Sequence, residues 1–160
     1  MMPDWLPEFC ATDGEWSAVA ADLYNAFVRD IVTDPPRIEG CPVWWRRRMV
    51  DGHEETFWHL VTRDDAEVGE RLFDPRRAER LRWCGAILRH CDDPAVTRWR
   101  YREQRGQIRL YLWLHDHDYV VVLEEREVRG GKVYFLISAH HLDGESRRRN
   151  LRRKYEKREP

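Results

Sequence analysis

Apolar side chains recur every three to four residues near the start of the chain, which is the period of an amphipathic helix. The residues that carry this pattern are Trp16, Val19, Leu23, Phe27 and Ile31. The pattern stops at Asp34-Pro35-Pro36, where proline cannot continue a helix. We therefore predict a helix over residues 16–32.

Two runs rich in aromatic and β-branched residues follow this helix. They are VWWRRRMV at residues 43–50 and TFWHLVTR at residues 56–63. Asp51-Gly52 lies between them, and this dipeptide is typical of a tight β-turn. The pattern predicts a β-hairpin in which both runs are strands.

A second helical pattern covers residues 75–90. Asp74 can cap its start, and Pro75 suits the first helical position. Its apolar side consists of Ala78, Leu81, Ile87 and Leu88, widened by Trp83 and Cys84. Because one side is apolar, we expect this helix to pack on a sheet, and Asp92-Asp93-Pro94 ends it.

Four further runs at residues 98–103, 107–115, 118–127 and 132–141 favour strands. The connections between them are short, with Gly106 and Gly130-Gly131 marking two turns, so neighbouring strands must run antiparallel. After them, residues 144–158 place Leu151 and Tyr155 four residues apart among arginines, which indicates a basic helix. The expected class is therefore α+β: an N-terminal helix and β-hairpin, a helix packed on a four-stranded antiparallel meander, and a basic C-terminal helix.

Length and composition support one globular domain over residues 1–160. The chain has 36% charged residues and eight Trp, and no apolar run approaches the length of a membrane span. The first ten residues, MMPDWLPEFC, lack the features of a signal peptide, so we expect a cytoplasmic protein with no membrane partner. The four cysteines have irregular spacings, and we expect free, mostly buried thiols.

Charge is distributed unevenly along the chain. Residues 1–40, an acidic and partly helical segment, carry eight Asp/Glu and two Arg, whereas residues 41–160 form the core of the expected domain and are net positive. The last 16 residues hold eight Lys/Arg and three Glu, enough to neutralise phosphates, although such a run can also be a solvated helix face. We expect the acidic N-terminal helix to lie against this basic surface and to weaken access to it.

Several kinds of site are disfavoured. His115-Asp116-His117-Asp118 could supply metal ligands, but it joins two predicted strands and no third ligand follows at a recognisable spacing. Cys84 and Cys91 fit no zinc pattern, and no glycine-rich phosphate loop is present. We expect neither a metal nor another cofactor.

The remaining candidates suit cleavage of RNA without a metal. Such a reaction needs a base for the ribose 2′-hydroxyl, cations for the phosphate and an acid for the leaving oxygen. His59, Arg77, Ser138 and Lys154 have this chemistry. Each also has a structural interpretation: a half-buried strand histidine, a first-turn surface arginine, a serine satisfied within a strand and a solvated lysine.

Five blocks, in this order, resemble a family of phage and bacterial proteins. They are FWHLVTR (57–63), RLFDPRRAERLRW (71–83), YLWLHDHDYVVVLEE (111–125), YFLISAHHLD (134–143) and RRKYEKR (152–158). The family belongs to the barnase, EndoU, colicin and RelE-like ribonuclease superfamily. The resemblance runs from near residue 40 to the end, and it lies in the order of the blocks because no single block is diagnostic.

This resemblance implies a toxin-type, metal-independent endoribonuclease with helices on one side of an antiparallel sheet and an RNA site on the open face. Carried over by position, the catalytic residues are His59, Arg77, Ser138 and Lys154, with serine where threonine is more typical. The residues expected to bind RNA around them are Arg76, Tyr119, Arg149, Arg153 and Tyr155.

Two other functions stay open. A non-catalytic RNA-binding module would stack bases on exposed aromatic residues, for which the candidates are Trp44, Trp45, Trp99 and Tyr101. A phage or mobile-element protein would instead bind a host protein complex, for example to inhibit a defence system. RNA is the expected ligand, and the candidate protein partners are a cognate antitoxin or immunity protein, or that host complex.

Overall fold

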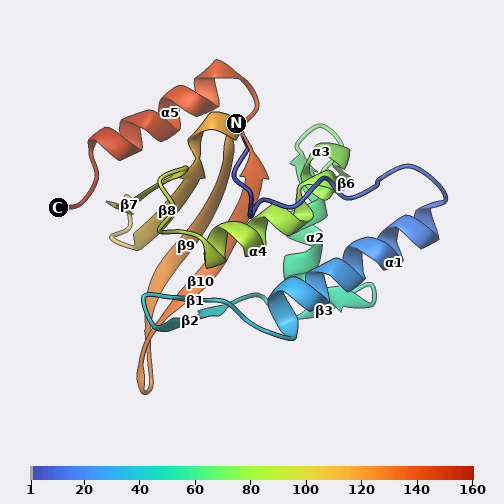
Figure 1. Ribbon diagram of the computed structural model, residues 1–160, viewed down its shortest axis with the longest axis horizontal. Helices are drawn as coiled ribbons and strands as arrows, with labels where there is room; N and C mark the ends of the chain where they lie inside the picture. Colours follow the sequence, from blue (N-terminus) through green and yellow to red (C-terminus); the bar gives the residue numbers. More distant parts are fainter. Residues whose placement is uncertain (1) are drawn as a thin grey trace.

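A six-stranded sheet runs through the molecule (Figure 1). The computed structural model describes residues 2–160. The strands of the sheet are β1 (Arg37–Ile38), β2 (Cys41–Trp44), β7 (Val96–Arg102), β8 (Ile108–Leu114), β9 (Tyr119–Val128) and β10 (Gly131–His141). Their order in space is β1-β2-β10-β9-β8-β7. Together with the helices described below, they make the α+β class that the sequence predicts.

Strands β7, β8 and β9 each pair antiparallel with the strand that follows in the chain. Gly106 and Gly130 adopt positive φ angles of 91° and 98° in two of the connecting turns. On the edge away from β9, β10 pairs in parallel with β2, at Tyr134 and Phe135. The sheet is therefore mixed, and the expectation of purely antiparallel pairing for residues 96–141 is wrong at this edge. The long chain between β2 and β10 allows the crossover that a parallel pair requires.

The predicted hairpin over residues 43–63 is also wrong. Only β3 (Met49–Val50) and β4 (His53–Glu54) pair around Asp51-Gly52, and residues 55–61 form helix α2 (Glu55–Val61). The buried residues of α2 are Thr56, Phe57, Leu60 and Val61, which lie on one side of a helix. A second hairpin follows, formed by β5 (Thr62–Asp65) and β6 (Glu70–Phe73).

The N-terminal helix lies where the apolar pattern predicts it. Helix α1 (Trp16–Phe27) continues into a π-helical segment, η1 (Val28–Val32). The predicted helix over residues 75–90 is divided at Arg80 into α3 (Pro75–Glu79) and α4 (Leu81–Arg89). The Asp74 carboxylate accepts hydrogen bonds from the backbone N–H groups of Arg76 and Arg77, so this residue is the expected N-cap.

Both faces of the sheet carry buried side chains. On one face, α1 and α4 bury Leu23, Phe27 and Ile87 in the larger core cluster, together with Val121 of β9. On the other, α5 (Gly144–Glu156) places Leu151 in a second cluster that contains the neighbouring Val120. Successive residues of a strand point to opposite faces, so α5 lies on the face opposite α4 (Figure 1). Helices therefore cover both faces, and the expectation of helices on one side only is wrong.

The acidic N-terminal segment does not cover the basic helix. Helix α1 packs against α4, on the face of the sheet away from α5 (Figure 1). Two of its carboxylates have arginine partners elsewhere: Asp30 lies 3.2 Å from Arg82, and Glu39 lies 2.9 Å from Arg98. The segment supplies part of the core, because Leu23 and Phe27 are buried in the larger cluster.

The structure also describes the four cysteines and the length and polarity of the helices. All four cysteines are free thiols, although only Cys84 and Cys91 are buried. Burial raises the pKa of the Cys84 thiol to about 12, which keeps it protonated and unreactive near neutral pH. None of the described helices is both long enough and apolar enough to cross a membrane.

Candidate functional site

A cleft of about 450 Å³ lies where the end of β10 meets α2, α3 and the β5–β6 hairpin. We call it the polar cleft. It is lined by His59, Arg63, Asp64, Arg71, Asp74, Arg77, Ser138, His140, His141, Asp143 and Arg147. Three of the four residues predicted to be catalytic, His59, Arg77 and Ser138, thus reach one cleft from three separate elements.

The fourth predicted residue, Lys154, lines an adjoining groove of about 240 Å³ beneath α5. The groove and the polar cleft share Ser138, His140 and Arg147. The Lys154 ammonium donates hydrogen bonds to the Tyr111 hydroxyl at 2.9 Å and to the Glu103 carboxylate at 3.2 Å. Lys154 is therefore paired within the adjoining groove and does not line the polar cleft.

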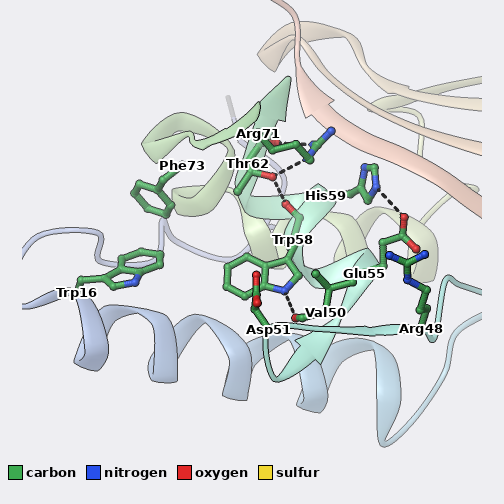
Figure 2. A pocket seen from close by; sticks show the side chains of 10 residues that line it. All are labelled: Trp16, Arg48, Val50, Asp51, Glu55, Trp58, His59, Thr62, Arg71 and Phe73. Carbon is green, nitrogen blue, oxygen red and sulfur yellow. Dashed lines mark hydrogen bonds and ion pairs between the residues drawn. The ribbon is translucent and has the colours of Figure 1, made fainter. Parts of the chain in front are cut away.

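His59 lies on α2, with 30% of its side chain exposed to solvent. Its Nε2 atom is 3.6 Å from the Glu55 carboxylate one helical turn earlier (Figure 2). Burial lowers the pKa of His59, and the positive charges of Arg71 and Arg46 lower it further, whereas Glu55 opposes this shift. The imidazole is thus both accessible and easily deprotonated, as a proton-transfer group must be.

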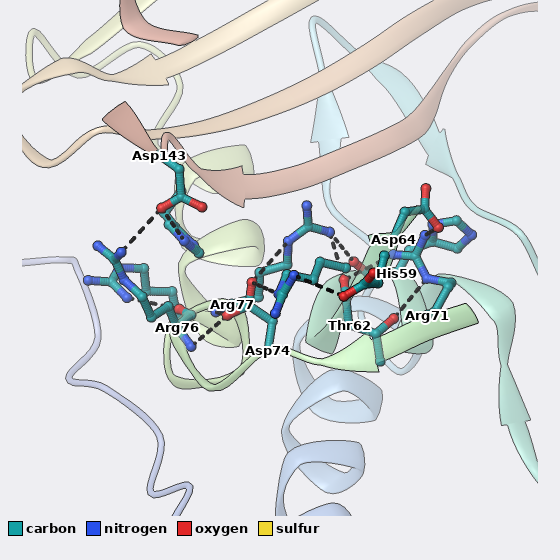
Figure 3. Close-up of polar contacts among 12 residues, drawn as sticks. His59, Thr62, Asp64, Arg71, Asp74, Arg76, Arg77 and Asp143 are labelled. Carbon is teal, nitrogen blue, oxygen red and sulfur yellow. Dashed lines mark hydrogen bonds and ion pairs between the residues drawn. The ribbon is translucent and has the colours of Figure 1, made fainter. Parts of the chain in front are cut away.

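Arg77 holds the end of α2 in place. Its Nη1 group donates hydrogen bonds to the carbonyl oxygens of Thr62 at 2.7 Å and His59 at 3.3 Å (Figure 3). Arg71 donates to the same Thr62 carbonyl at 2.9 Å. Carbonyl groups in the last turn of a helix lack partners within the helix, so both guanidinium groups satisfy this end of α2. In this structure Arg77 acts on the backbone of His59, which makes it a positioning residue.

Two histidines of β10, His140 and His141, were not among the predicted site residues. His140 lines the cleft beside Ser138, and its buried Nδ1 atom has no hydrogen-bond partner among the described residues. Burial lowers the pKa of His140 to about 4, with contributions from the charges of Arg77 and Arg147. Strand alternation is the signal that could have placed His140 on the same face as Ser138.

His141 is paired more firmly than His140. Only 6% of this residue is exposed, and its Nε2 atom lies 3.1 Å from the Asp143 carboxylate. The same carboxylate receives a hydrogen bond of 3.2 Å from Arg76 (Figure 3). The Arg76 that we expected to bind RNA is thus on the rim of the cleft, in an exposed ion pair with Asp143.

Tyr119 is not available to a ligand, which corrects the expectation that it binds RNA. Only 1% of it is exposed, and its ring packs edge-on against Trp83 at 5.6 Å between centroids. Tyr119 begins a strand with buried residues on both faces, and it belongs to the larger core cluster.

The other residues expected to bind RNA lie outside the polar cleft. Arg149 and Arg153 are exposed on the side of α5 opposite the buried Leu151. Tyr155 is half-buried, with its ring edge-on to Trp99 at 5.3 Å between centroids.

The aromatic residues proposed for a binding module are mostly inside the protein. Trp45 and Trp99 are 6% and 4% exposed, and Tyr101 is half-buried. Trp44 alone of this set is well exposed, at 41%. A stacking platform made of these four side chains is therefore absent from the described surface.

The part of the chain that the structure describes contains no group of three or more His, Cys, Asp or Glu residues suited to a metal ion. His115 and His117 lie in a single 3₁₀ turn, η2 (His115–His117), between β8 and β9. The His115 Nδ1 atom is 2.7 Å from the Thr97 hydroxyl, which satisfies it locally.

Comparison of the chain with family models, with curated proteins and with solved structures gives no match. The likeness to the ribonuclease superfamily therefore rests on the sequence blocks alone.

Proposed function

We propose that this protein is a metal-independent endoribonuclease that cleaves RNA by attack of a ribose 2′-hydroxyl on the adjacent phosphate. The observation that carries the proposal is the convergence of His59, Arg77 and Ser138 on one polar cleft together with His140. A cleft with two proton-transfer groups, cations and a hydroxyl contains the parts that this reaction needs.

The two histidines divide the proton transfers. His140 has the lower pKa, about 4, so it is neutral near pH 7 and accepts the proton of the 2′-hydroxyl. The 2′-oxygen then attacks phosphorus, and the bond from phosphorus to the 5′-oxygen breaks. His59, beside the Glu55 carboxylate, donates a proton to that leaving oxygen. The products are a 2′,3′-cyclic phosphate and a 5′-hydroxyl end.

Cations and one hydroxyl hold the phosphate in this scheme. Arg147 is exposed on α5 and lines both the polar cleft and the adjoining groove. Arg63 is 49% exposed, and its carboxylate contacts are long, at 3.9 and 4.0 Å. Either guanidinium can therefore turn to a phosphate, while Ser138 donates a hydrogen bond to it. Lys154 extends the positive charge along the groove.

The direct test is incubation of the purified protein with RNA in EDTA. We expect fragments that end in 2′,3′-cyclic phosphate. Arg147→Ala is expected to lower kcat/KM about tenfold, because a hydrogen bond from a charged group to the phosphate is lost. Arg152→Ala is the matched control on the same helix, since Arg152 is exposed and lines neither the cleft nor the groove.

Two results of this experiment would contradict the proposal. RNA that is bound but left intact would indicate the non-catalytic RNA-binding module. RNA that is neither bound nor cleaved would favour the host protein complex as the partner. Under the proposal itself, the enzyme acts on RNA in the cytoplasm, and a toxin-type role requires a cognate antitoxin or immunity protein that covers the polar cleft.

The pH dependence of cleavage follows from the two histidines. His140 must be deprotonated, so kcat/KM is expected to rise with pH through a value of about 4. His59 must be protonated, and its pKa is lowered from 6.5, so kcat/KM is expected to fall again as the pH rises through a value below 6.5. The predicted profile is a bell with a mildly acidic optimum. An optimum at alkaline pH in a profile of the wild-type protein would contradict this division of roles.

A further inference from the structure

A second cleft, of about 430 Å³, opens on the other side of His59. We call it the aromatic cleft because Trp16, Trp58 and Phe73 line it. It shares His59 and Arg71 with the polar cleft, so these two side chains lie between the clefts and line both. A ligand that reacts at His59 can therefore extend into both.

Trp16 is unusually exposed for its position. It shares the apolar side of α1 with Val19 and Leu23, which are buried, yet 47% of Trp16 is exposed. Its ring meets Phe73 nearly edge-on, with centroids 4.8 Å apart and planes at 70°. Phe73 thus packs against the indole, while much of the Trp16 surface is exposed to solvent and accessible to another ring that stacks on it.

Trp58 is fixed relative to His59. Its indole N–H donates a hydrogen bond of 2.6 Å to the Val50 carbonyl, and it precedes His59 on α2. Figure 2 shows Trp16 and Phe73 on one side of the cleft and His59 with Glu55 on the other, with the Trp58 indole between them. The aromatic surface and the reactive imidazole are therefore parts of one preformed site.

We infer that the aromatic cleft binds a nucleobase of the RNA, stacked on Trp16, while the neighbouring phosphate lies in the polar cleft. This inference rests on the proposed function, because it assigns the substrate's base to the cleft beside the proposed reaction. An aromatic ring suits any base, since every base has a π-face. Arg71 at the junction and Arg48 at the rim supply positive charge near the backbone of the same nucleotide.

The test measures binding and not cleavage. The probe is a short 2′-O-methyl RNA, which lacks the attacking hydroxyl, compared with the same oligonucleotide carrying one abasic residue. Trp16→Ala is expected to weaken binding of the complete probe about tenfold, as the loss of one stacked base predicts. In this variant the abasic probe should bind as well as the complete probe. Trp44→Ala is the matched control, because Trp44 is similarly exposed, at 41%, and does not line the aromatic cleft.

The outcomes separate this inference from the proposed function. If Trp16→Ala retains the full difference between the two probes, the inference is overturned even where wild-type protein cleaves RNA. If the difference depends on Trp16 but RNA stays intact, the base site stands and the ribonuclease proposal fails. If wild-type protein binds neither probe, the inference is overturned as well.

Discussion

Replacement of His59 by alanine is expected to lower kcat/KM for RNA cleavage by about 100- to 10,000-fold, the usual contribution of a general acid or base. The reason is that His59 lines both the polar and the aromatic cleft and has the Glu55 carboxylate beside it to support its protonated form. The variant should fold normally, because the side chain is 30% exposed and forms no part of either core cluster.

The measurement for this prediction is a rate of cleavage in EDTA at the pH optimum of the wild-type protein. His115→Ala is the control, since His115 lies in the η2 turn and lines neither cleft. Binding of the 2′-O-methyl probe should persist in His59→Ala, which separates loss of proton transfer from loss of the site. A His59→Ala protein as active as the His115→Ala protein would remove His59 from the mechanism.

Local patterns predicted the elements that have long, regular periodicity. Helix α1 lies on the repeat of Val19, Leu23 and Phe27, and the π-helical segment η1 follows it. The run at residues 56–63 was wrongly predicted to be a strand, because a run of eight residues rich in aromatic and β-branched types fits either a strand or a helix. The run is a helix that buries Phe57, Leu60 and Val61. This choice depends on tertiary packing, which the sequence pattern does not show. The parallel pair of β2 with β10 is likewise a contact between distant segments.

The sequence named candidate residues that lie close together, but it did not predict their contacts. His59, Arg77 and Ser138 do line one cleft, but Arg77 is bound to backbone carbonyls, a contact that depends on the unexpected helix α2. Tyr119 illustrates the opposite error, since a tyrosine after a polar turn looks exposed in the sequence and is buried here. Strand alternation could have placed His140 beside Ser138, but the cleft at this face of β10 is formed by segments distant in the sequence.

The N-terminal segment and the sheet are joined at Trp83 of α4. This residue is 1% exposed, and its indole N–H donates a hydrogen bond of 2.9 Å to the Pro7 carbonyl. Its ring contacts Phe9 at 5.4 Å and Tyr119 at 5.6 Å between centroids. Trp83 thus connects Pro7 and Phe9 to Tyr119 of β9, and it lines neither cleft.

Trp83→Ala is expected to lower the free energy of unfolding by about 3–5 kcal/mol, because it removes a large buried ring and leaves a cavity. The Pro7 carbonyl would also lose its donor, while Trp5 would keep its hydrogen bond to Asp93. Urea denaturation followed by circular dichroism measures the loss, with Arg152→Ala as a control at an exposed residue, expected to change stability by less than about 0.5 kcal/mol. Small domains have a total free energy of unfolding of about 5–15 kcal/mol, so Trp83→Ala is expected to remove a large part of it. Equal stabilities for the two variants would show that the N-terminal segment is not anchored through Trp83.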